Sequence, residues 1–129
     1  MYLYNGANNK DLARFGENLA VQEVEKLGYE IIQKNYSCPI GEIDIVAKHN
    51  NMLVFIEVKT RKSQFYGMPQ EAVNRRKQEK ICRVASWFIK EYHFKDVSIR
   101  FDVVSVLLKK SSFAEVQIIS GAFSGNGAL

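Results

Sequence analysis

The chain has 129 residues, of which 47% are hydrophobic and 25% are charged, and its formal net charge is +4 at neutral pH. This length suits one domain and is too short for two, and the composition is typical of a soluble globular protein. No apolar run reaches the length of a membrane span, and the first five residues lack the blocks of a secretory signal. We therefore expect a cytoplasmic protein without membrane contact, folded as one domain over residues 1–129, with its core at about 10–119 and a loose tail at 120–129.

The first predicted element is a helix from about Lys10 to Leu27. One of the two asparagines before it can cap its start, and Gly28 ends it. Its apolar residues form one stripe at helical spacing, with Gly16 inside the stripe and Glu17 on its border. A glycine there lets the helix approach a sheet closely, and Glu17 would then look toward the sheet edge. From the helical pattern alone, solubility and support of the helix dipole are a sufficient role for Glu17.

Three strands are predicted after this helix, at residues 29–34, 37–46 and 53–60, with an interruption near Asn35. The polar break at residues 49–51 is short enough to join the second and third strands antiparallel.

Charged residues lie inside these apolar strands: Asp44 in the second, and Glu57 and Lys59 in the third. Residues two apart in a strand share a face, so Glu57 and Lys59 project together. If the hairpin register sets Asp44 opposite the Glu57 region, two carboxylates and an ammonium meet on one face. Burying such charges is costly unless they are paired or bind a metal ion.

Carboxylate and carbonyl oxygens are the ligands that Mg²⁺ prefers. A lysine beside such an ion could orient or help to deprotonate a water, or neutralise charge on a phosphate. An acidic residue two positions before a lysine is common on exposed strands, but Asp44 and the apolar character of both strands favour a site. The pattern therefore indicates metal-dependent phosphodiester cleavage.

The segment from Lys59 to Arg83 has eight basic residues against two acidic ones. Such a segment attracts a polyanion and gives salt-sensitive binding. A solvated helix face explains the charge equally well. We expect Arg75, Arg76 and Lys80 to lie on the outside of this segment.

Pro69 suits the first turn of a second helix that extends to about Tyr92. Lys77 falls within the apolar stripe of this helix, where a cation should reach for solvent or point at a negative group. Gln70 shares that face. If the helix packs behind the Glu57 strand, both side chains could reach a bound phosphate.

Strands at 97–108 and 114–119 complete the order helix, three strands, helix, two strands. This order predicts an α/β fold, with a mixed β-sheet flanked by helices. The connection through the second helix should make the Glu57 and Phe101 strands parallel.

Taken together, these residues resemble the YraN-like family of small bacterial proteins, which is similar to Holliday junction resolvases within the PD-(D/E)xK nuclease superfamily. The matching positions are Glu17, the run Gly41-Glu42-Ile43-Asp44, the run Phe55 to Arg61, Lys77, and the run Arg100 to Val104. The resemblance covers about residues 10–108.

The resemblance implies a restriction-endonuclease-like core in which Asp44, Glu57 and the Val58 carbonyl bind Mg²⁺, for which Mn²⁺ can substitute. In this family pattern Lys59 assists the attacking water, and Glu17 supports the metal or the water. Accessory roles fall to Lys77 and Gln70, and Arg61 approaches the backbone phosphate.

Three functions are open at this point. The first is a Mg²⁺-dependent endonuclease that acts on DNA, with branched or damaged structures as candidate substrates. The second is a non-catalytic module that docks on nucleic acid or on a recombination or repair partner, through Arg61, Arg75, Arg76 and Lys80. The third is a structural interaction protein with a solvated basic helix. Junction resolvases are commonly dimers, so a homodimer is expected by analogy.

Overall fold

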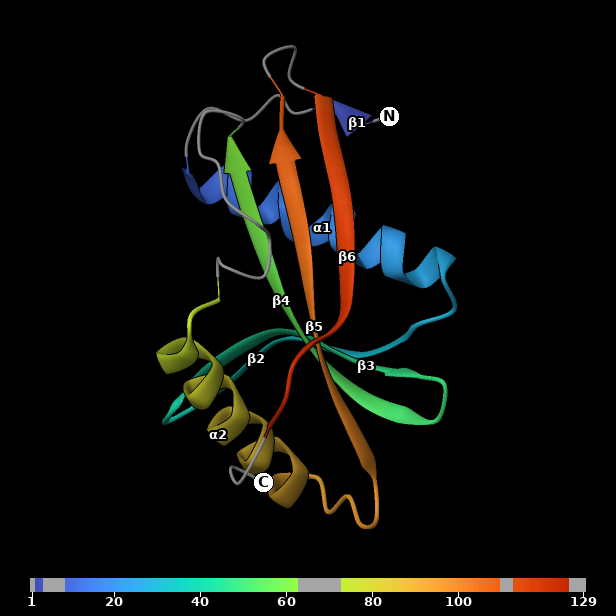
Figure 1. The fold of residues 1–129 in the computed structure, drawn as a ribbon, viewed down its shortest axis with the longest axis vertical. Helices are drawn as coiled ribbons and strands as arrows, with labels where there is room; N and C mark the ends of the chain where they lie inside the picture. Colours follow the sequence, from blue (N-terminus) through green and yellow to red (C-terminus); the bar gives the residue numbers. More distant parts are fainter. Residues whose placement is uncertain (1, 4–8, 63–72, 110–112, 126–129) are drawn as a thin grey trace.

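The computed structural model describes residues 2–3, 9–62, 73–109 and 113–125 of the chain (Figure 1). Its elements in chain order are β1 (Tyr2–Leu3), α1 (Asn9–Lys26), β2 (Glu30–Cys38), β3 (Gly41–His49), β4 (Met52–Lys62), α2 (Arg75–Glu91), β5 (Ser98–Leu108) and β6 (Phe113–Phe123). Within these residues the strands form one six-stranded sheet in the order β1-β6-β5-β4-β3-β2.

The sheet is mixed, because β4 and β5 run parallel while their neighbours pair antiparallel. This confirms the predicted α/β class, the restriction-endonuclease-like order of helix, three strands, helix and two strands, and the parallel pairing of the Glu57 and Phe101 strands. The short β1, which pairs with β6, is an addition that the sequence pattern did not predict.

The two helices cover opposite faces of the sheet. Successive residues of a strand point to opposite faces, so neighbouring residues of β4 contact different helices. Val54 packs with residues of α1, whereas its neighbour Phe55 packs with Val84 and Phe88 of α2. In Figure 1, α1 crosses behind the sheet and α2 lies beside its lower half. Neither helix, within the described residues, has the length and apolar character needed to span a membrane.

The second helix begins later than predicted. It starts at Arg75, and Asn74 caps it in extended backbone geometry, with its side-chain oxygen accepting the Lys77 N–H at 3.0 Å. Such a cap satisfies one of the N–H groups that a helix start leaves unpaired. Pro69 and Gln70 lie outside the described residues.

The prediction of a break near Asn35 was wrong. Asn35 has a left-handed φ of 54° but stays within β2, because asparagine tolerates this conformation as a single residue. The chain reverses instead at residues 39–40, where Pro39 lacks the N–H that a ladder needs. At the next reversal Asn50 and Asn51 both take positive φ, as a two-residue hairpin turn requires.

The predicted loose tail at 120–129 and the core limit at 119 were also wrong. Strand β6 continues to Phe123, whose ring stacks on Phe101 with 4.9 Å between centroids. The N–H of Gly121 donates a hydrogen bond to Oδ1 of Asp102, with 2.9 Å between nitrogen and oxygen. These two contacts hold the end of β6 against β5, and residues 126–129 lie outside the described part of the chain.

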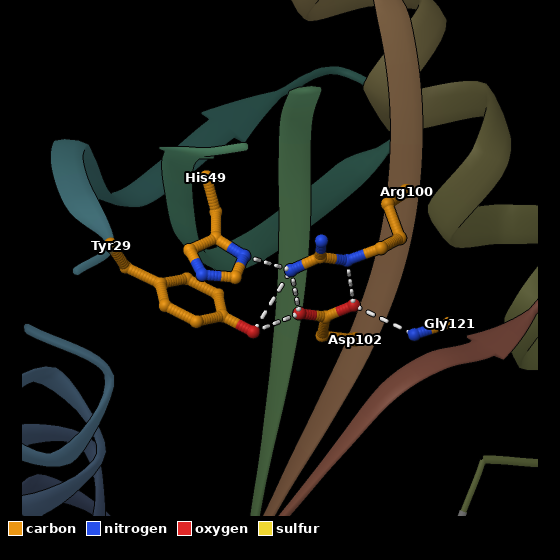
Figure 2. A network of polar contacts seen from close by, with 5 residues as sticks. All are labelled: Tyr29, His49, Arg100, Asp102 and Gly121. Carbon is orange, nitrogen blue, oxygen red and sulfur yellow. Dashed lines mark hydrogen bonds and ion pairs between the residues drawn. The ribbon is translucent and has the colours of Figure 1, made fainter. Parts of the chain in front are cut away.

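Figure 2 shows a polar network that joins strands β3, β5 and β6 to Tyr29, the residue before β2. Asp102 is 0% exposed, and its carboxylate accepts hydrogen bonds from Arg100 at 2.8 and 2.9 Å, from the Tyr29 hydroxyl at 2.7 Å and from the Gly121 N–H. The Arg100 Nη2 also lies 2.9 Å from Nδ1 of His49, whose ring stacks on Tyr29. Since a guanidinium can only donate, Nδ1 of His49 accepts this bond and carries no proton.

The network predicts that Arg100→Ala destabilises the protein by about 3–5 kcal/mol, because the change leaves the buried Asp102 carboxylate without its cation. Urea unfolding followed by circular dichroism measures this loss. Arg83→Ala, an exposed arginine of α2, is the control and should change the free energy of unfolding by less than about 0.5 kcal/mol. Similar midpoints for the two variants would contradict the assigned role of the network.

Candidate active site

Two acidic side chains meet across the β3–β4 hairpin. Ile45 pairs with Ile56, so the next residues along the two strands, Asp44 and Glu57, lie opposite each other. Oδ2 of Asp44 accepts a hydrogen bond from the Val58 N–H at 2.7 Å. The structure thus brings together the two carboxylates that the strand pattern singled out.

Helix α2 supplies a cation to this pair. Nζ of Lys77 lies 2.8 Å from Oε1 of Glu57, and the side chains are 36% and 11% exposed. The Asn74 cap fixes the start of the helix and so places Lys77 in its first turn. The cation in the apolar stripe therefore points at a negative group, one of the two outcomes that the sequence allowed.

Burial and repulsion perturb the Asp44 carboxyl. Burial, together with the nearby negative charges of Glu57 and Glu17, raises the pKa of Asp44 to about 7, against a partial opposing effect of the Val58 N–H. Two carboxylates this close resist ionising together. The pair therefore favours the approach of a positive charge.

The pKa values of the two lysines at the site, Lys59 and Lys77, shift in opposite directions. Burial and the neighbouring Lys77 ammonium lower the pKa of Lys59, although Glu57 and Asp44 offset part of this effect. Burial is the largest single effect on Lys77 and acts to lower its pKa, but the hydrogen bonds to Glu57 and Lys59 and the negative charges of Glu57 and Asp44 together outweigh burial, so the net pKa is raised. Lys77 thus keeps its proton on the ion pair, and Lys59 is the amine that releases a proton more readily.

The close approach of α1 to β4 adds a third carboxylate. A Cβ on Gly16 would lie 1.8 Å from Oγ1 of Thr60, so this contact has no room for a larger residue. Glu17, the next residue of α1, lines the same cavity as Asp44. The glycine in the apolar stripe therefore lets the helix bring Glu17 to the edge of the site, as the sequence suggested.

Two cavities meet at Asp44. One has a volume of about 440 Å³ and lies between α1 and strands β2 and β3. The other, of about 420 Å³, lies against α2 and also contains Glu57 and Lys77. Asp44 therefore faces a cavity on either side, whereas Glu57 faces only the cavity against α2.

The other predicted residues lie around these cavities at different depths. Arg61 is half-buried on β4, whereas Arg75 and Arg76 are exposed at the start of α2. Lys80 is exposed, as expected, and it also lines the cavity that holds Glu57 and Lys77. Gly41 makes room for it, since a Cβ at that position would lie 2.9 Å from Cε of Lys80. Gln70 falls outside the described residues.

The donors at the site suit a hard cation. Asp44 and Glu57 offer carboxylate oxygens, and the Val58 carbonyl is the third donor implied by the family resemblance. No group of three or more His, Cys, Asp or Glu side chains converges on one point within the described ranges. A site with two carboxylates leaves positions for waters and a phosphate, which is the coordination that Mg²⁺ favours.

Sequence reasoning missed the polar residues on the α1 side of Asp44, namely Arg14, Asn18, Lys34 and Asn35. Lys34 pairs with Ile45 and Tyr36 pairs with Ile43, so Asn35 lies across the ladder from Asp44. The signal was the polar Lys34-Asn35 pair in an otherwise strand-like segment. It becomes informative only when the β2–β3 register is known.

The mixed sheet, the helix on each face and the acidic pair with its lysine define a PD-(D/E)xK nuclease-like protein. The chain belongs to the uncharacterised protein family UPF0102, whose model matches residues 16–106. This agrees with the family resemblance drawn from the sequence.

Relatives in this family are similar over most of their length. A UPF0102 protein of Caldicellulosiruptor saccharolyticus is 42% identical over 117 residues, covering 90% of this chain and 99% of the relative. A UPF0102 protein of Clostridium botulinum strain Kyoto is 48% identical over 118 residues, covering 89% of this chain and 95% of the relative. Among solved structures, SfsA of Pyrococcus furiosus in complex with Ca²⁺ is similar at 12% identity with a TM-score of 0.39, over 88% of this chain and 64% of that one.

We predict that Asp44→Asn stabilises the metal-free protein at alkaline pH, because the amide removes a half-buried charge beside Glu57 and its oxygen still accepts a hydrogen bond from the Val58 N–H. The folded protein holds a proton on Asp44 that the unfolded chain releases above 3.8. Stability from this group is therefore complete below 3.8 and is lost as the pH rises through about 7.

The measurement is Tm in EDTA, compared between variant and wild type at about pH 5 and about pH 8. The advantage of the variant should grow toward the higher pH. Asp96→Asn, at an exposed aspartate, serves as the control and should show no such trend. An advantage that is equal at both pH values would contradict the raised pKa.

Proposed function

We propose that this protein is a Mg²⁺-dependent endonuclease that hydrolyses phosphodiester bonds of DNA in the cytoplasm, with branched or damaged DNA as its candidate substrates. The observation that carries the proposal is the opposition of Asp44 and Glu57 beside Lys59, in a site open to two cavities. Mn²⁺ should substitute for Mg²⁺, since both accept oxygen ligands.

Asp44, Glu57 and the Val58 carbonyl would hold the ion. Bound there, Mg²⁺ would polarise the scissile phosphate and acidify the attacking water. Nζ of Lys59, whose pKa is lowered, can accept a proton from that water or donate a hydrogen bond to the phosphate. Glu17 lies near enough to Asp44 to affect its pKa, so it can help to orient the water.

Cations around the site would bind the substrate. Lys80 lines the α2 cavity next to Lys77, and Arg61 lies on β4 two residues beyond Lys59. The exposed Arg75 and Arg76 extend positive charge along the start of α2. Phosphates bound by such residues orient a nucleic acid without reading its sequence. Two symmetric cuts at a branch would need two sites, so a homodimer is part of this proposal.

A non-catalytic module that docks on nucleic acid or on a repair partner is the second candidate. The ion pair between Lys77 and Glu57 favours it, because the pair neutralises one of the proposed metal ligands at 2.8 Å. A module of this kind would keep that ion pair and bind DNA through the exposed cations of α2. Its binding would weaken with salt and would need no divalent ion.

The nuclease proposal predicts that purified protein cuts labelled branched or single-stranded DNA in Mg²⁺ or Mn²⁺, and that EDTA stops the reaction. Asp44→Ala and Glu57→Ala should each abolish cutting, because each removes a carboxylate ligand. Lys59→Ala should slow cutting by about 10²–10⁴-fold, the usual contribution of a positioned acid or base. The matched control is Glu25→Ala, at an exposed glutamate of α1, which should cut at the wild-type rate.

Calorimetric titration with Mn²⁺ separates the two candidates. Under the nuclease proposal the wild type binds the ion and the Asp44→Ala and Glu57→Ala variants do not. Cutting that survives in both variants would indicate a contaminating nuclease. DNA binding without Mn²⁺ binding would support the docking module in its place.

A further inference from the structure

The cavity between α1 and strands β2 and β3 contains more than the acidic edge of the candidate active site. Its lining falls into four chemical kinds. They are the cations Lys10, Arg14 and Lys34, the amides Asn18 and Asn35, the apolar residues Ala13, Val21 and Ile45, and the carboxylates Glu17 and Asp44. The cations and amides have no role in the metal site as described above.

This combination matches the parts of a nucleotide. Arginine and lysine bind phosphate oxygens through charge-assisted hydrogen bonds. Asparagine amides both donate and accept, as the edge of a base requires. The short apolar side chains give a dry surface for a sugar or the face of a base, as in most small-molecule sites.

The balance of charge differs between the two cavities that share Asp44. Three cations face two carboxylates in the lining on the α1 side. On the α2 side, Lys77 and Lys80 face three carboxylates, those of Glu42, Asp44 and Glu57. The excess positive charge thus lies on the α1 side, and a phosphate next to the one being cut is better bound there.

Asn35 connects this cavity to the acidic pair. It lies across the β2–β3 ladder from Asp44, and its left-handed φ of 54° is unusual for a residue inside a strand. Residues held in sparsely populated backbone conformations concentrate at functional sites. A nucleotide that contacts Asn35 would therefore lie next to Asp44.

The size of the cavity limits what can enter. Its volume of about 440 Å³ is in the range of small-molecule sites, about 300–1,000 Å³. This space suits one nucleotide, and a base enters a pocket between a helix and a sheet only after it has left the duplex stack. The occupant must therefore be unpaired.

We propose that this cavity is a subsite for one unpaired nucleotide adjacent to the bond that is cut, with Arg14 of α1 and Lys34 of β2 on its phosphate. The inference rests on the proposed nuclease function and narrows its substrate class. The protein acts where DNA presents a single-stranded nucleotide beside the scissile phosphate, and intact duplex is a poor substrate.

The experiment measures the affinity of labelled oligothymidylate and of a labelled blunt hairpin duplex by fluorescence anisotropy. It is done in Ca²⁺, with gels to show that the DNA stays intact. The test variant is Arg14→Ala combined with Lys34→Ala. The control combines Lys90→Ala and Lys95→Ala, two exposed lysines outside both cavities. Circular dichroism melts show whether each variant is folded.

We expect the test variant to bind the single strand about tenfold more weakly than the wild type. Its salt dependence should flatten by about 0.7 in the log–log slope, because the two side chains are proposed to neutralise one phosphate of a single strand. The control should keep wild-type affinity and slope. Arg14→Lys with Lys34→Arg, which preserves both charges, should bind like the wild type and so separates loss of charge from loss of folding.

Three results would overturn the subsite. One is equal affinity of the test and control variants for the single strand. The second is an equal loss of affinity for single strand and duplex in the test variant, which would indicate general attraction. In both cases cutting that depends on Asp44 would leave the proposed function standing. The third, a wild type that neither binds nor cuts any DNA, would end the proposed function and the subsite together.

Discussion

The register of the β3–β4 hairpin is the constraint on which the candidate site depends. Asn50 and Asn51 close the hairpin with positive φ, and this fixes the pairing of Ile45 with Ile56 and the opposition of Asp44 and Glu57. A slip of one residue would move every side chain of a strand to the other face. Both faces of β4 are buried, because Val54 packs under α1 and Phe55 under α2, so the slip is strongly disfavoured.

Two aspartates of the structure, the buried Asp102 and the half-buried Asp44, illustrate different solutions to the cost of removing a charge from water. Asp102 is surrounded by donors, since Arg100, Tyr29 and Gly121 all direct hydrogen bonds at its carboxylate, and it ties β5 to its neighbours. Asp44 accepts from the Val58 N–H but lies beside Glu57, and its pKa is raised to about 7. A satisfied carboxylate stabilises the fold, whereas a carboxylate in a like-charged pair at a cavity is typical of a functional site.

The placement of one helix on each face of the sheet gives the site two sides with different chemistry. Helix α2 contributes Lys77, which holds Glu57 in an ion pair, and α1 contributes Glu17 through the close contact at Gly16. Asp44 lies between the two cavities that result. In the proposed function, the reacting phosphate lies at the acidic pair and the next nucleotide lies toward α1.

The sequence by itself determined the order of the elements, the parallel pairing through α2 and the shared face of Glu57 and Lys59. These follow from periodicity within single segments, from the chirality of connections and from the residues shared with a known family. Tertiary structure decided the Lys77–Glu57 ion pair, the place of Asn35 opposite Asp44, and the Tyr29–Asp102 contact between residues 73 apart in the chain. It also decided that β6 runs to Phe123 and that α2 starts at Arg75, after its Asn74 cap. Local propensity carries no information about register or packing between distant segments, because those depend on which surfaces are buried together.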